Sequence, residues 1–550
     1  MAPAALLALA LPVLSGCHAS VRGVEEPDGT ERPTVLSLRV TAGLPGEGVR
    51  AVTDSQDPNV APAEGTGEGK ITYMQLSMPN VGLLKQTTLT PDAGGKDYSA
   101  RFQLPLKQRV TTPYAVLVGS QDLGLTKENF TADQTVGSDR FLDVIHKDGF
   151  IQTSKSSDGT TTIEPGVTDP LVENRNVITT EVERIVAKVQ VSQKDRLSLT
   201  LPSIGTFSPL TYSMAGSAKE TYLFRDHAGS RTLVNETAES AIYTDFKSVI
   251  DDKTVPATDW DPKAGHPFLQ RVSDKEEGTD KYVLDGYYRN PKEVTTATET
   301  ATSINGGFYF YENSMYGGDK KVASKKGEIK YNRIAYAKVY TKLTPTNAYT
   351  VGDDLRTKVV APLSEVNAAN RSCLVPISKE LYDKLKQDPK YSNKVSSGWS
   401  FNLPSGRAEY ALRVEDKPGT FYVGGEDGEV YLDLRAAAWF GNKTARKYDK
   451  GRMVYLLPLN RQLDPTKKFV NYCDTRRNNI YDITIDGISD IGHNYDPVDP
   501  DDPNVPKPED NPFEPPADPQ IPVEEPDYLM RITAKVIKWN LVEKHYALWN

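Results

Sequence analysis

Cysteine and long apolar runs are scarce in this chain of 550 residues, and its 65 Lys and Arg are outnumbered by 74 Asp and Glu. Only three cysteines occur, Cys17, Cys373 and Cys473, and three cannot form a disulfide framework. Cys373 and Cys473 could pair in an oxidising compartment or could remain free thiols, and the sequence leaves both readings open. The net charge of −9 argues against nucleic acid as a partner, because phosphate binding requires basic patches.

The motifs of common enzyme and metal sites are also missing. No two of the six histidines are four residues apart, so HExxH is absent, and no GxSxG nucleophile elbow occurs. We therefore expect no catalytic residue, no metal and no cofactor, and we interpret the chain as a protein that is not an enzyme.

Three segments resemble binding motifs only superficially. Residues 65–70 (GTGEGK) lack the spacing of a phosphate-binding loop and follow no strand, which favours a flexible loop. The carboxylates of residues 496–502 could bind Ca²⁺ weakly, but their spacing by prolines fits no EF-hand, so a solvated linker is the better interpretation. The aromatics of residues 308–316 could stack on sugar, although such side chains are more often cross-strand core pairs.

The residues that are abundant favour strands and turns. The chain contains 28 tyrosines, 40 glycines and 38 prolines, and it is rich in Val, Thr and Ile. Many short alternating segments separated by turn residues indicate β-sandwiches. The length predicts two or three domains.

The first residues read as an export signal. Residues 3–16 (PAALLALALPVLSG) are apolar but too short for a stable membrane span, and they fit the hydrophobic region of a signal peptide. They end at Leu14-Ser15-Gly16-Cys17, which resembles a bacterial lipobox and predicts lipidation at Cys17; an ordinary signal peptide with a chance cysteine is the alternative. No basic region precedes the segment, so the natural start could lie upstream of Met1.

A strong strand signal follows at residues 34–44. Alternate apolar residues share one face of this predicted strand: Leu36, Leu38, Val40, Ala42 and Leu44. A segment rich in Gly and Pro then leads to Arg50-Ala51. An arginine in such a segment is a good protease target, and cleavage there would detach both Cys17 and the strand.

A second isolated strand is predicted near the end of the printed sequence. Residues 496–527 are rich in Pro and acid, form neither helix nor central strand, and reach up to roughly 100 Å at about 3.1 Å per residue. In residues 528–550, Tyr528, Met530, Ile532, Ala534 and Val536 alternate with Arg531, Thr533 and Lys535. A lone strand is unstable in water. It could fold back on its own body or complete another chain, and we favour the second.

Three further motifs lie between these ends: residues 182–189 (VERIVAKV), 308–313 (FYFYEN) and 476–485 (RRNNIYDITI). With the lipobox, Arg50-Ala51, the linker and the closing strand with Trp539, they resemble the FimA-type fimbrillins, the subunits of type V pili in Bacteroidales. The likeness extends over essentially the whole chain and is greatest to the shaft subunit of the short fimbriae. The late motif and the tail are its most specific parts.

The resemblance implies a maturation pathway. An arginine-specific protease would cut after Arg50, remove the strand at 34–44 and open an apolar groove. The lost burial of five apolar side chains would cost on the order of 10 kcal/mol, if each contributes about 2 kcal/mol. The tail of another subunit would fill the groove by β-strand addition, head to tail. The expected donor residues are Met530, Ile532, Ala534, Val536, Trp539, Leu541, Tyr546 and Leu548.

The resemblance also implies the architecture, an all-β chain of two tandem transthyretin-like β-sandwich domains with minor helix. The expected divisions are a signal peptide (1–17), a propeptide (18–50), an N-terminal sandwich (51–180), a C-terminal sandwich (181–495), a linker (496–527) and a donor strand (528–550).

The expected location is a fimbrium on the cell surface, with a precursor that is lipid-anchored at the outer membrane. The implied partners are other copies of the chain, accessory fimbrial subunits, the protease, and host or bacterial surface ligands. Two alternatives remain: an anchor or tip accessory subunit, and a monomeric glycan-binding surface lipoprotein whose tail folds onto its own body.

Overall fold

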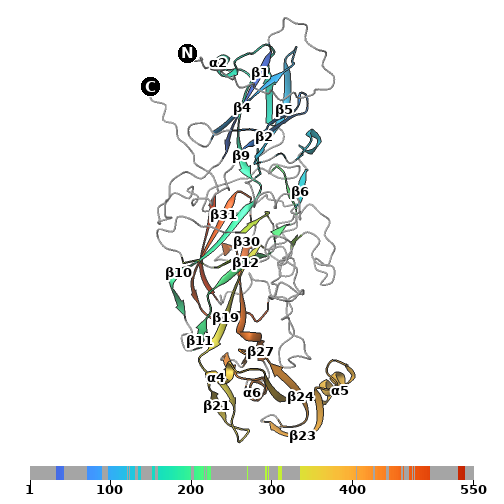
Figure 1. Ribbon diagram of the computed structural model, residues 1–550, viewed down its shortest axis with the longest axis vertical. Helices are drawn as coiled ribbons and strands as arrows, with labels where there is room; N and C mark the ends of the chain where they lie inside the picture. The colour runs from blue at the N-terminus through green and yellow to red at the C-terminus, as the bar shows by residue number, and fades with distance from the viewer. Residues whose placement is uncertain are drawn as a thin grey trace, which may run out of the picture.

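The computed structural model shows sheets arranged along a long axis, with the sheet containing β1 at one end and a lobe containing α5 at the other (Figure 1). The structure describes residues 33–42, 71–89, 97–120, 122, 124–130, 134–137, 151–154, 159–199, 204–215, 217–218, 220–224, 269–270, 292–293, 295–296, 308–312, 335–403, 406–424, 428–440, 445–459, 462–463, 470–472, 475, 477–495 and 530–538.

The first sheet has the strand order β3-β2-β5-β7-β9-β1-β4, and an eighth strand, β8, pairs with β5. Its strands are β1 (Thr34–Ala42), β2 (Tyr73–Met78), β3 (Gly82–Gln86), β4 (Asp97–Leu104), β5 (Val110–Gly119), β7 (Gln152–Ser154), β8 (Gly159–Ile163) and β9 (Val177–Arg184). Period-two alternation builds its core, because every second residue of a strand faces the same side. On β4 the buried residues are Tyr98, Ala100, Phe102 and Leu104.

A β-sandwich follows directly, since β9 ends at Arg184 and β10 begins at Ala187. One sheet contains β17-β10-β31-β32 with β18 paired to β10, and the other contains β11-β19-β12-β16 with β28 paired to β19. The strands are β10 (Ala187–Leu199), β11 (Gly205–Phe207), β12 (Thr211–Ala215), β16 (Lys292–Glu293), β17 (Thr295–Thr296), β18 (Phe308–Phe310), β19 (Tyr336–Pro345), β28 (Arg452–Pro458), β31 (Asn479–Ile488) and β32 (Met530–Lys538). The sheets share one core, where the rings of Tyr212 and Phe308 meet edge to face with centroids 5.4 Å apart.

A lobe is built from residues 348–448 and has a hydrophobic core of its own, although some of its buried residues, such as Ala348, Phe421 and Tyr448, belong to the core of the sandwich. It contains a sheet in the order β21-β20-β26-β25-β27 and a sheet in the order β22-β24-β23. Its elements are β20 (Ala348–Val351), β21 (Lys358–Ala361), α4 (Leu363–Val366), β22 (Arg371–Ile377), α5 (Lys379–Gln387), β23 (Val395–Leu403), β24 (Gly406–Asp416), β25 (Phe421–Gly424), β26 (Glu429–Tyr431), α6 (Leu434–Phe440) and β27 (Ala445–Tyr448).

Short elements complete the described chain. They are η1 (Lys127–Asn129), β6 (Thr135–Gly137), α2 (Pro170–Glu173), β13 (Ser217–Ala218), β14 (Glu220–Tyr222), β15 (Leu269–Gln270), η4 (Asp449–Gly451), β29 (Gln462–Leu463) and β30 (Val470–Tyr472). The prediction of an all-β chain with minor helix is confirmed, because the longest described helix, α5, has nine residues. Ser378 caps α5 by accepting the Leu381 N–H at 3.2 Å.

Cys373 on β22 is a free thiol. Burial, reinforced by the carboxylates of Asp433 and Asp416, raises the pKa of this thiol to about 12. The thiolate is the reactive form, so we expect Cys373 in the folded protein to resist iodoacetamide at pH 8.5, near the ordinary thiol pKa, and to react once urea unfolds the lobe. Peptide mapping by mass spectrometry measures labelling at Cys373 alone, and equal labelling rates in the folded and unfolded protein would contradict this expectation.

Candidate functional site

Strand β1 is an interior strand of the first sheet, with a hydrogen-bonded neighbour on each side. It runs antiparallel to β4, with Leu38 opposite Ala100, and parallel to β9, with Leu38 opposite Ile178. In the sheet order β1 therefore separates β9 from β4. Taking β1 away would leave two rows of unpaired backbone groups that face each other across a slot one strand wide.

The predicted apolar face of β1 is in the core. Leu36, Leu38 and Val40 are each 0% exposed and belong to the hydrophobic cluster of the first sheet. At roughly 2 kcal/mol for each buried side chain, these three contribute on the order of 6 kcal/mol that the chain would lose with β1. Ala42 ends the strand, with its backbone opposite Val182. Leu44 lies outside the described residues.

The outer face of β1 is held by one carboxylate of β4. Arg39 Nη2 lies 3.2 Å from Asp97 Oδ2, and the Thr41 hydroxyl donates to Asp97 Oδ1 at 2.9 Å. Asp97 is the residue opposite Thr41 in the register. Because the Arg39 side chain is half-exposed, this ion pair contributes at most about 1 kcal/mol.

The start of β1 is held through its backbone by Asn176, which lies just before β9. The Asn176 amide Nδ2 donates to Val35 O at 3.2 Å and to Glu164 O at 2.8 Å, and Ser37 N donates to Asn176 O at 2.9 Å. Asn176 is buried and adopts φ of 53°, a conformation that Asn tolerates better than most residues. These bonds to β1 use only its backbone, so any strand with the same path could replace it.

The predicted tail strand is present as β32 and pairs antiparallel with β31 of the same chain. Within the described residues it is the outermost strand of its sheet, with one neighbour. The register sets Met530 opposite Ile488, Ile532 opposite Ile485, Ala534 opposite Ile483 and Val536 opposite Tyr481. Those four residues of β31 are buried. The alternate residues 530, 532, 534 and 536 of the tail therefore lie opposite the buried residues of β31.

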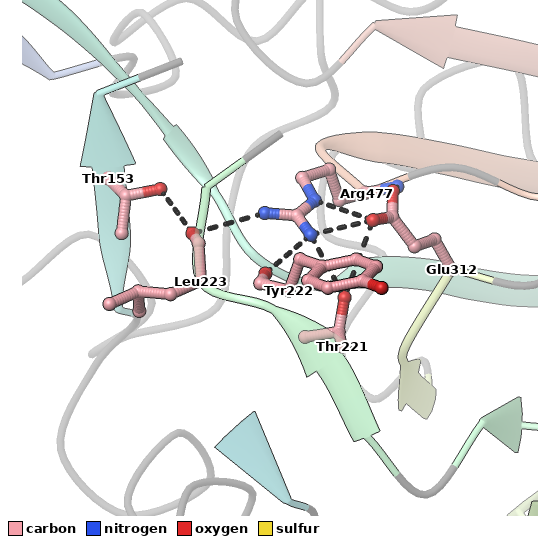
Figure 2. A network of polar contacts seen from close by, with 6 residues as sticks. All are labelled: Thr153, Thr221, Tyr222, Leu223, Glu312 and Arg477. Carbon is pink, nitrogen blue, oxygen red and sulfur yellow. Dashed lines mark hydrogen bonds and ion pairs between the residues drawn. The ribbon is translucent and has the colours of Figure 1, made fainter. Parts of the chain in front are cut away.

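A buried polar network joins the first sheet to the sandwich (Figure 2). Arg477 and Glu312 form an ion pair with Nη2 and Oε1 2.6 Å apart, and their side chains are 1% and 5% exposed. Arg477 also donates to the carbonyls of Tyr222 and Leu223, at 2.6 and 3.3 Å. Leu223 O accepts a further bond from the Thr153 hydroxyl of β7 at 2.8 Å.

This joint unites the three internal motifs of the sequence. Arg477 belongs to the motif at 476–485 and Glu312 to the motif at 308–313. Asn478 connects them to the third motif, because its Oδ1 accepts the Arg184 N–H at 3.3 Å and its N–H donates to Val186 O at 2.7 Å. The antiparallel pairing of β6 with β14 adds a backbone connection at the same place. The three motifs therefore share a structural role, to fix the first sheet on the sandwich.

Several predicted site residues lie outside the described residues: Cys17, Leu44, Arg50, Ala51, Trp539, Leu541, Tyr546 and Leu548. The structure brings Leu36, Leu38 and Val40 together in the core and places β32 on β31. Sequence reasoning missed Asp97, Asn176 and Glu312 as partners, since each acts across a long sequence separation. Asn176 alone carried a local signal, an asparagine before an apolar strand.

The described residues also bear on metal binding and on membrane-spanning helices. In the described part of the chain no group of three or more His, Cys, Asp or Glu side chains could hold a metal ion. No described helix combines the length and apolar character that crossing a membrane requires.

Burial raises the pKa of Tyr98, opposite Val40, above its ordinary value, so this phenol stays neutral beside the core face of β1.

One family comparison names a class of protein for part of this chain. Residues 446–544, which include β31 and β32, match the model described as "Major fimbrial subunit protein type IV, Fimbrillin, C-terminal". The resemblance to fimbrillins is thereby confirmed over these residues.

Solved structures that resemble the chain include three bacterial proteins. A fimbrilin from Porphyromonas gingivalis W83 is 13% identical, with coverage of 93% of this chain and 99% of that chain and a TM-score of 0.39. A cell adhesion protein candidate from Parabacteroides distasonis ATCC 8503 is 10% identical, with coverage of 92% and 100% and a TM-score of 0.35. The tip fimbrial protein from Porphyromonas gingivalis, truncated at its C-terminus, is 10% identical, with coverage of 83% and 96% and a TM-score of 0.28. No curated protein matches the chain.

Proposed function

We propose that this chain is a structural subunit, of the shaft type, of an adhesive fimbria on the cell surface, and not an enzyme. The precursor is exported as a lipoprotein with its lipid on Cys17 and is tethered at the outer membrane. An arginine-specific protease cleaves between Arg50 and Ala51. The leader leaves with β1, and the tail of another copy enters the vacated slot.

One observation carries this proposal: β1, the strand encoded ahead of the cleavage site, is an interior strand with a fully buried face. Losing it exposes the core residues that pack on Leu36, Leu38 and Val40, removes β1 as the partner of β4, and leaves the edge of β9 that faces β1 unpaired, while β9 stays paired with β7. A slot of this kind requires an occupant, because unpaired strand edges and exposed apolar surface are unstable in water.

The tail is the occupant that the chain offers. Among the described strands it has one neighbour, β31, whereas the slot provides two, β4 and β9. Backbone pairing on both sides therefore favours the slot once β1 has left. The contact is head to tail, so repetition gives an open fibre and not a closed dimer.

The partners follow from this assembly. They are other copies of the chain, accessory fimbrial subunits at the ends of the fibre, and host or bacterial surface ligands of the assembled fimbria. An anchor subunit would keep its leader and its lipid, and a tip subunit would need no free tail; the tail strand of this chain favours the shaft.

The pairing of β32 with β31 favours a second candidate, a monomeric glycan-binding surface lipoprotein with its tail on its own body. In the fimbrial proposal this pairing is the resting state of the tail before assembly. The two candidates differ in whether the tail leaves β31 after cleavage.

Blocking the cleavage separates them. With Arg50→Ala we expect a lipidated monomer, while the unchanged chain gives ladders on SDS gels run without boiling and mature protein that begins at Ala51. Arg109→Ala, which removes an exposed arginine whose Nε lies 3.0 Å from Glu164 Oε1, is the matched control and should leave the ladders intact. Ladders of the same strength from Arg50→Ala, with the leader still attached, would refute the proposal.

A further inference from the structure

The two strands that are proposed to exchange share a short sequence. Residues 38–42 read LRVTA and residues 530–534 read MRITA, so Arg, Thr and Ala recur at the same spacing and the apolar residues between them are similar. The first segment lies in β1 and the second in β32. These five residues alone are enough to align the two strands.

Each residue of the first segment has a defined place in the sheet. Leu38 and Val40 are fully buried, and Arg39 and Thr41 both bind Asp97 on the outer face. The recurring residues therefore include the pair that binds Asp97 as well as the apolar row.

From this match we infer that the tail of a second copy enters the slot in one register, with Arg531 in the place of Arg39 and Thr533 in the place of Thr41. Met530 and Ile532 then replace Leu38 and Val40 in the core. Asp97 is the acceptor of both outer-face contacts and fixes the position of the donor strand. This inference rests on the proposed function and specifies how the partner binds.

The structure disfavours the neighbouring registers in which the same face stays inward. Moving the tail so that Met530 replaces Leu36 places Arg531 at the position of Ser37, which is 3% exposed, and a guanidinium there would be buried. Moving it the other way, with Met530 at Val40, places Pro526 at Leu36, an inner position of the strand opposite Phe102 of β4, where proline removes a backbone donor.

A larger shift, with Met530 at Thr34, fails for another reason. It places Ala534 at the fully buried position of Leu38 and leaves a cavity in the core. It also sets Ile537 against Asp97 in place of Thr41, so the hydroxyl contact is lost. A shift by one residue turns the apolar face outward. Of these registers, only the inferred one places apolar residues at positions 38 and 40 together with Arg and Thr at positions 39 and 41. In it Pro526 falls at Thr34, the first residue of β1, where proline is tolerated.

Cysteine pairs distinguish these registers. In the inferred register residue 531 lies opposite Ser99, because Arg39 is opposite Ser99 in β1. Opposed Cα atoms are about 4.5–5.5 Å apart, within the range of a disulfide, whereas a shift of two residues adds about 7 Å along the strand. Ser99→Cys in one preparation is mixed with Arg531→Cys, Leu529→Cys or Thr533→Cys in another, then both are cleaved and oxidised.

We expect boiled, non-reduced gels to show the intermolecular link with Arg531→Cys at least about tenfold above the other two, as a register preference of about 1.4 kcal/mol implies. A dominant link with Leu529→Cys or Thr533→Cys, in samples that still give unboiled ladders, would refute the register and leave strand exchange intact. Absence of ladders from the unchanged cleaved chain would instead refute the proposed function.

A charge exchange provides a second readout that needs no cysteine. Asp97→Arg should weaken the unboiled ladders several-fold, and Arg531→Asp on the same chain should restore them. Lys535→Asp is the matched control and should not restore them. Rescue by Lys535→Asp and not by Arg531→Asp would overturn the assignment of Asp97 to Arg531.

Discussion

A chain that ends at Asp527 is expected to be cleaved after Arg50 and to remain monomeric, with unboiled ladders lost completely. The reason is that the slot left by β1 has no donor: Leu36, Leu38 and Val40 are gone, and about 6 kcal/mol of burial is not replaced. The same chain with its slot filled by a tail peptide should be stable, because the peptide restores both rows of backbone pairing.

The measurement is addition of a synthetic peptide of residues 526–550 to the shortened, cleaved subunit. We expect one peptide to bind per subunit, to raise the thermal midpoint of the subunit and to leave it monomeric. A peptide with Met530→Asp and Ile532→Asp is the matched control and should not bind. Normal filaments from the chain shortened at Asp527 would contradict the whole scheme.

The second large effect is expected at the joint between the first sheet and the sandwich (Figure 2). Arg477→Met should lower the free energy of unfolding by about 3–5 kcal/mol, the range observed when one member of a buried ion pair is removed. It leaves the Glu312 carboxylate buried and removes the donor from the carbonyls of Tyr222 and Leu223. Urea denaturation, followed by circular dichroism, measures the loss.

Two variants make this prediction specific. Arg101→Met removes an exposed arginine that lies 3.4 Å from Asp169, and it should cost less than about 1 kcal/mol. Glu312→Leu added to Arg477→Met removes the orphaned carboxylate and should recover a large part of the loss. If Arg477→Met and Arg101→Met cost the same, Arg477 and Glu312 do not hold the two parts together.

Local patterns in the sequence predicted the elements but not their partners. Alternation identified β1 and β32 within a few residues of their bounds. Alternation did not separate the lobe of residues 348–448 from the sandwich, because strands of both have the same period.

The polar contacts could not be read from local pattern because they join distant residues. Glu312 and Arg477 are separated by 165 positions, and Arg39 and Asp97 by 58. An acidic residue in a strand gives no sign of which cation it will meet. The match between residues 38–42 and 530–534 is different, because comparing the two isolated strands with each other reveals it without a structure.

The position of β1 between two strands also has a mechanical consequence. β1 pairs with β4 from Thr34 to Thr41 and with β9 from Ser37 to Ala42, so it is bonded on both edges from Ser37 to Thr41. Tension applied along such a strand loads all of these bonds together in shear, instead of breaking them one after another as in peeling. A filament whose subunits are linked in this way would resist fluid drag at its joints for as long as both edges stay paired.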